Sequence, residues 1–116
     1  MKISKELSVE NVRAYIAKLG GVSMVELERY FDNTKGKSAI EMQADNCSNV
    51  VVWSGMSAKF CSVVMELEES GKVEMKPTPL LVYITDGRRL DMPIAEVVKH
   101  YTSPHWLPIE YNIINS

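Results

Sequence analysis

Apolar residues recur every three or four positions behind Ser8, a residue type that caps helix N-termini. This spacing predicts a helix over residues 9–19, which ends at a pair of glycines. Ser23 is followed three residues later by Glu26, the sequence of a capping box, so a second, short helix is expected to begin there. The apolar positions of the two helices are Val9, Val12, Ile16, Leu19, Met24, Leu27, Tyr30 and Phe31.

The middle of the chain carries a weaker pattern. Polar clusters at 33–37 and 45–49 predict that residues 32–49 are loop with at most a helical turn. β-branched and aromatic residues then fill positions 50–53 and are followed by Ser54-Gly55. This composition predicts a short, buried strand.

A third helix is predicted to begin at Ser57, its cap, and to end at Gly71, with apolar side chains at helical spacing between them. Polar and apolar residues alternate over 72–76, as in a strand with one buried face. A proline-rich turn at 77–79 and a second β-branched run at 80–85 follow. Together these segments predict a β-hairpin on the end of the third helix.

The last thirty residues begin with a turn at 86–89 and continue into an apolar stripe that predicts a final helix. The tail at 102–116 contains two prolines but is too apolar for a free end, so we expect it to pack back on the core. The residues of the stripe are Ile94, Val97, Val98 and Tyr101.

Composition narrows the class of protein. A chain of 116 residues with 46% hydrophobic and 24% charged residues has the profile of one globular domain, 1–116. Its formal charge of −2 provides no overall attraction for a polyanion. Binding to nucleic acid would therefore need a local basic patch.

Neither catalysis nor metal binding is expected. The chain has no Gly-rich phosphate loop, zinc-protease motif or nucleophile elbow. Cys47 and Cys61 fit neither a disulfide scaffold nor a zinc pattern. His100 and His105 lie five residues apart with Pro104 between them, and no nearby carboxylate completes a plausible ligand set. We expect no cofactor. A polar N-terminus and the absence of a long apolar run predict a cytoplasmic protein without membrane association.

The third helix and its exit carry a family resemblance. The sequence Ser57-x2-Phe60-x3-Val64-x2-Leu67-Glu68-x2-Gly71-x-Val73, after two shorter helices, resembles the winged helix-turn-helix family over residues 8–85. The resemblance implies a small α+β, winged-helix-like domain of three N-terminal helices and a β-hairpin wing, followed at 86–116 by a C-terminal helix and packed tail. The 24 residues at 32–55 are either an insertion into that fold or a sign of another α+β fold.

The resemblance implies a DNA-binding transcriptional regulator. The helix at 57–70 would lie in the major groove of double-stranded DNA, and its early exposed residues would reach base edges. Those residues are Ser57, Lys59 and Ser62. Phosphate contacts would come from the flanking loops and the wing, through Lys35, Lys37, Lys76, Arg88 and Arg89.

The charge of this region leaves a second function open. Residues 56–76 hold three lysines against four glutamates, a net −1, and Glu66 and Glu69 share the outward helix face with Lys59. An acidic face suits a protein–protein interaction module that regulates or inhibits a partner. A homodimer formed through the 94–101 stripe is a related expectation.

Overall fold

The computed structural model describes residues 3–114 and contains, within them, four helices and two three-stranded sheets, an α+β fold. The helices are α1 (Val9–Leu19), α2 (Met24–Tyr30), α3 (Ala58–Glu69) and α4 (Leu80–Thr85). The strands are β1 (Val22–Ser23), β2 (Lys35–Glu41), β3 (Ser48–Met56), β4 (Val73–Pro77), β5 (His100–Trp106) and β6 (Ile109–Ile113).

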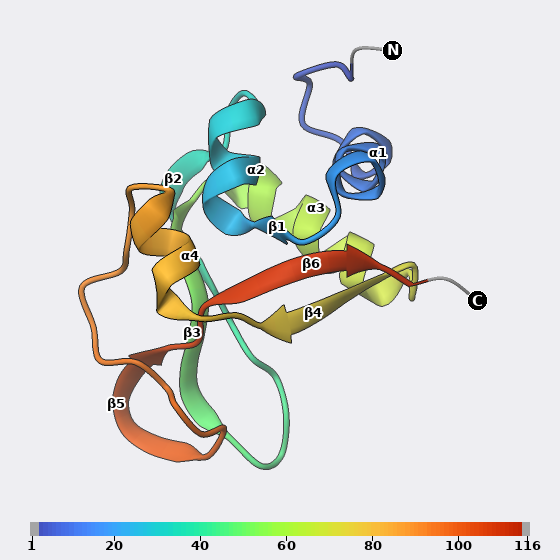
Figure 1. The fold of residues 1–116 in the computed structure, drawn as a ribbon. Coiled ribbons are helices and arrows are strands. Elements are labelled where there is room, and N and C mark those ends of the chain that lie inside the picture. Colours follow the sequence, from blue (N-terminus) through green and yellow to red (C-terminus); the bar gives the residue numbers. More distant parts are fainter. Residues whose placement is uncertain (1–2, 115–116) are drawn as a thin grey trace.

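The first sheet has the strand order β1-β6-β4, and both of its pairs are antiparallel. Its central strand comes from the end of the chain, so that Tyr111 of β6 lies opposite Val22 on one side and Met75 on the other. The helices α1 and α3 pack against each other and contact this sheet, as Figure 1 shows. α3 leads almost directly into β4, with Gly71 in the left-handed conformation that ends the helix.

The second sheet has the order β2-β3-β5 and extends away from α1 (Figure 1). β2 and β3 are antiparallel, whereas β3 and β5 are parallel. The sheet makes the molecule elongated, with extents of 44 × 31 × 26 Å. β2 is an edge strand that runs beside α3.

Three aromatic rings join the second sheet to α4. Trp53 of β3, Tyr83 of α4 and Trp106 of β5 are fully buried, and their ring centroids lie 5.0 to 5.9 Å apart. The Tyr83 hydroxyl donates to the carbonyl of Ile109 at 2.6 Å and accepts from the N–H of Met24 at 3.0 Å. These contacts tie α2, α4 and β6 together, and the buried residues form one hydrophobic cluster.

The local signals in the first two helices are confirmed. α1 has the predicted bounds, and Ser8 caps it by accepting from the N–H of Asn11. Ser23 and Glu26 form the predicted capping box at the start of α2. The strand predicted at 50–53 is also confirmed and continues to both sides as β3.

The prediction of a loop at 32–49 is wrong, because residues 35–41 form β2. Of the side chains in β2 only Ile40 is buried, so the strand has no alternating apolar pattern by which it could be recognised. Its pairing with β3 is irregular, with register shifts along its length.

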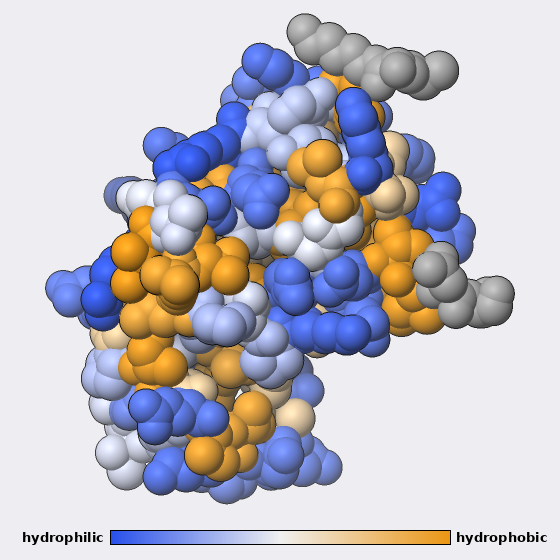
Figure 2. Space-filling model, in the orientation of Figure 1, coloured by the Kyte–Doolittle hydropathy of each residue, from blue (hydrophilic) through white to orange (hydrophobic). Residues whose placement is uncertain are grey.

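The predicted β-hairpin wing at 72–84 is also wrong. Its first half is β4, but residues 80–85 form α4, and β4 pairs with β6 from the end of the chain. The β-branched composition of α4 favours a strand, yet burial of Tyr83 beside two tryptophans fixes a short helix instead. Leu81 and Ile84 of this helix are exposed, and Figure 2 shows apolar side chains gathered over α4.

No helix forms at 94–101, so the predicted C-terminal helix is wrong and the stripe proposed for a homodimer is not a helix face. The N–H of Ala95 donates to the carbonyl of Trp106, and the N–H of Trp106 donates to that of Pro93. These bonds hold residues 93–95 beside the end of β5. The described part of the tail does pack back as predicted, and it does so as β5 and β6. Residues 115–116 of the predicted tail lie outside the described residues.

Candidate nucleic-acid interface

The N-terminus of α3 is fastened to the start of β2. Ser57 Oγ accepts from the N–H of Phe60 at 3.0 Å, as an N-cap does, and donates to the carbonyl of Asn33 at 2.7 Å. The N–H of Ser57 donates to the carbonyl of Thr34 at 2.8 Å. The hydroxyl of Ser57 is therefore already used within the protein.

This junction brings lysines from two elements to one end of α3. Lys35 lies opposite Met56 in the β2–β3 pairing, and a Cβ on Gly36 would lie 2.7 Å from Ser57 Cα. Lys35 and Lys37 therefore lie beside the first turn of α3, which itself carries Lys59. All three lysine side chains are exposed, and they add to the positive end of the helix dipole.

Arg88 forms an ion pair within the protein. Its Nη1 lies 2.6 and 2.7 Å from the two carboxylate oxygens of Glu28, and its guanidinium stacks 5.1 Å from the centroid of Trp53. Glu28 is only 8% exposed, so this ion pair neutralises a buried charge. Arg88 is held as a structural residue, whereas its neighbour Arg89 is exposed.

Arg29 belongs to this end of the molecule and is missing from the sequence-based set. It donates to the backbone carbonyl of Asp86 and lines, with Lys35 and Arg88, a hollow of about 320 Å³. Only the fold brings α2, β2 and the loop after α4 together, so no sequence signal marks it. The basic end is the name used below for the exposed cations around this hollow and the start of α3, together with Arg89, which follows Arg88 in the chain: Arg29, Lys35, Lys37, Lys59 and Arg89.

The three predicted base-reading residues do not share one open face. Ser57 caps the helix, Lys59 borders a hollow formed with residues 6–10, and Ser62 borders a hollow formed with Ser38 and Ala39 of β2. β2 thus flanks the side of α3 that carries Ser62. A duplex approaching that side would meet β2 first.

Lys76 lies on β4, apart from the basic end. Its Nζ is 3.2 Å from a carboxylate oxygen of Glu74, and both side chains are exposed. Such a surface pair contributes little to stability but lowers the net charge that Lys76 offers to a phosphate.

The C-terminal half of α3 is acidic. Glu66 and Glu69 are exposed, and Glu68 is partly buried where its carboxylate accepts from the Tyr111 hydroxyl at 2.7 Å. Burial raises the pKa of Glu68, and the hydrogen bond from Tyr111 offsets this only in part. The two halves of α3 therefore present opposite charge.

Cys61 shows no activation as a nucleophile. Burial raises the pKa of its thiol, and its Sγ lies 3.8 Å from Met56 Sδ. His100 instead bonds to Ser48, and His105 stacks on Tyr101. Among residues 3–114 no group of three or more His, Cys, Asp or Glu side chains is placed to hold a metal ion. In the same range no helix is both long and apolar enough to cross a bilayer.

No family model matches the sequence, and comparisons with curated proteins and with solved structures give no significant match.

Proposed function

We propose that the protein is a DNA-binding regulator of winged-helix type that contacts backbone phosphates through the basic end. The observation that carries the proposal is the gathering of cations from α2, β2, α3 and the loop after α4 around the first turn of α3. Four of these five cations are among the residues that the sequence alone pointed to.

The order of elements supports the winged-helix part of the proposal. Helix, strand and helix are followed by α3 and β4, and β1, β6 and β4 form one antiparallel sheet against α1 and α3. On this interpretation β2 and β3 are an insertion between the second and third helices. The segment between β4 and β6, which contains α4 and β5, takes the place of a simple wing.

The geometry favours contacts to phosphates over contacts to base edges. β2 flanks α3, and the carboxylates of Glu66 and Glu69 would repel a phosphate backbone that ran along the whole helix. The basic end can still approach a backbone with the N-terminus of α3 pointing at it. Binding of this kind depends weakly on sequence and strongly on salt.

Charge-neutralising variants test this proposal. We expect Lys35→Gln combined with Lys37→Gln to weaken binding to a short labelled duplex by about tenfold per lysine near 100 mM salt, because each lysine accounts for one phosphate contact. Lys72→Gln is the matched control, because Lys72 is an exposed lysine beyond the other end of α3. Equal affinities for the double variant and the parent would show that the basic end is not the interface.

The acidic half of α3 favours a second function, a non-enzymatic interaction module that regulates or inhibits a protein partner. The specific observation is a groove between α3 and β2 whose charged side chains are all carboxylates. Three of its four carboxylates, Glu66, Glu68 and Glu69, belong to the C-terminal half of α3, whereas the lysines of the basic end lie at the start of the helix.

A further inference from the structure

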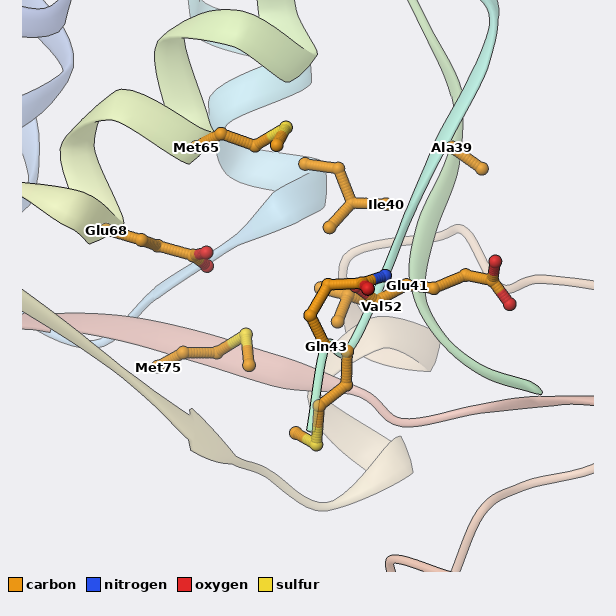
Figure 3. Close-up of a pocket in the computed structure, with 9 residues that line it drawn as sticks. Ala39, Ile40, Glu41, Gln43, Val52, Met65, Glu68 and Met75 are labelled. Carbon is orange, nitrogen blue, oxygen red and sulfur yellow. The ribbon is translucent and has the colours of Figure 1, made fainter. Parts of the chain in front are cut away.

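A cavity of about 390 Å³ lies between α3, β2 and β4. Figure 3 shows Met65 and Glu68 of α3 and Met75 of β4 extending toward β2, whereas Glu41 points away from them. Ile40, Val52 and Met42 add apolar lining. Met65 is 49% exposed, so its side chain forms part of the open wall of the cavity.

The cavity continues along α3 as a groove. A second hollow, toward the start of α3, shares Ala39 and Met65 with the first and is walled by Cys61, Ser62 and Glu69. Together the two hollows follow α3 from Ala58 to Glu69, which is about 17 Å of helix. This length matches about five residues of extended polypeptide.

The charge of the groove is of one sign. No Lys, Arg or His is among the described residues that line either hollow, whereas Glu41, Glu66, Glu68 and Glu69 are. Glu68 is the deepest of these: it is partly buried, and the hydrogen bond from the Tyr111 hydroxyl goes to a single one of its two carboxylate oxygens. The second oxygen is thus left for a donor that enters the cavity.

We propose that this groove binds an extended segment of a partner protein and takes one of its Arg or Lys side chains into the cavity. The aliphatic stem of that side chain would pack on Met65, Met75 and Ile40, and its cationic head would donate to Glu68. Unbranched methionines can repack around different neighbours of the basic residue. The carboxylates of the groove repel a nucleic-acid backbone, so this proposal rests on the function as an interaction module and not on DNA binding.

Two charge-matched variants separate the cavity from the general acidity of the surface. Glu68→Gln keeps an oxygen that can accept from Tyr111 but removes the negative charge inside the cavity. Glu74→Gln removes one negative charge from β4 next to Met75, on the strand face opposite to the cavity, because adjacent residues of a strand point to opposite faces. Both are expected to fold like the parent, which circular dichroism checks.

The experiment selects phage-displayed random heptapeptides on the immobilised folded protein and measures the affinities of the selected peptides by fluorescence anisotropy. We expect the selected peptides to contain Arg or Lys flanked by apolar residues. Their affinity should fall at least tenfold for Glu68→Gln, and it should change less than twofold for Glu74→Gln. Met65→Lys, which puts a competing cation into the cavity beside Glu68, should also abolish binding.

The proposal is overturned if no peptide is selected, if the selected peptides lack an enriched basic residue, or if they bind Glu68→Gln and Met65→Lys as tightly as the parent. Equal losses for Glu68→Gln and Glu74→Gln would indicate attraction to net charge only and would contradict insertion into the cavity. None of these results bears on DNA binding, which the lysine variants of β2 test independently.

Discussion

At the scale of single residues, Arg88 is an example of a surface cation that stabilises the fold. From the sequence alone, Arg88 and Arg89 are equal candidates for phosphate contacts, because both follow the turn at Asp86-Gly87. The structure pairs Arg88 with Glu28, 60 positions earlier in the chain, and leaves Arg89 exposed. Charge reversal at Arg88 would set two carboxylates against each other and would therefore test stability instead of binding.

We predict that Arg88→Ala lowers the free energy of unfolding by about 2 kcal/mol or more, because the buried carboxylate of Glu28 would lose its charged partner. Urea denaturation followed by circular dichroism measures the change. Arg89→Ala is the control and should alter stability by less than about 0.5 kcal/mol. An unfolding free energy of Arg88→Ala equal to that of the parent would mean that the Glu28 carboxylate does not need the ion pair.

The burial of Glu68 leads to a second prediction, which concerns how the stability of the protein depends on pH. Burial raises its pKa in the folded protein, so folding favours its protonated form, and stability is lost as pH rises from the pKa of the unfolded chain through that of the folded one. Glu68→Gln removes this loss. The variant should gain stability relative to the parent as pH rises from acid to neutral, measured by urea denaturation across that range. A stability difference that does not vary with pH would contradict a raised pKa.

At the scale of elements, the caps were predictable and the pairings were not. Ser8, Ser23 and Ser57 act within three residues of themselves, so their roles can be read from local sequence. β2 and α4 could not be recognised, because one is an exposed strand and the other a helix of strand-forming residues. Their structure depends on β3 and on the Trp53 and Trp106 rings, which are distant in sequence.

Separation in the sequence also limits how much of the candidate site can be predicted. Lys35, Lys37 and Lys59 could be identified as candidate contacts, but nothing local shows that β2 brings them to one end of α3. Arg29 joins this end only through contacts of α2 with the loop after α4. The methionine-lined groove is formed by three elements that are separated in the chain, so no sequence motif predicts it.

The junction between β2 and α3 makes a prediction at the element scale. Ser57→Ala removes the cap of α3 and the hydrogen bond to Asn33, so it should lower the unfolding free energy by about 1 to 2 kcal/mol. Ser62→Ala, an exposed position in the same helix, is the control. Thermal and urea unfolding measure the stabilities of the two variants. Equal unfolding free energies for Ser57→Ala and Ser62→Ala would show that the cap contributes nothing to stability.

At the scale of the whole molecule, charge is divided between two surfaces. The net charge of −2 conceals a basic end around the start of α3 and an acidic, methionine-lined groove beside its second half. The two proposals assign a DNA backbone to the basic end and a basic segment of a partner protein to the groove. Single-charge variants at either end should affect one activity and leave the other intact.

The most direct test of the central claim is the affinity for a short duplex of mixed sequence, measured by fluorescence anisotropy from about 50 to 200 mM salt. With three to five phosphate contacts from the basic end, log Kobs should fall against log salt with a slope of about −2.7 to −4.5. The Lys35→Gln, Lys37→Gln variant should reduce the magnitude of that slope by about 2, and Lys72→Gln should leave it unchanged. Absence of binding at the lowest salt, or a slope that the double variant does not alter, would contradict the proposed DNA-binding function.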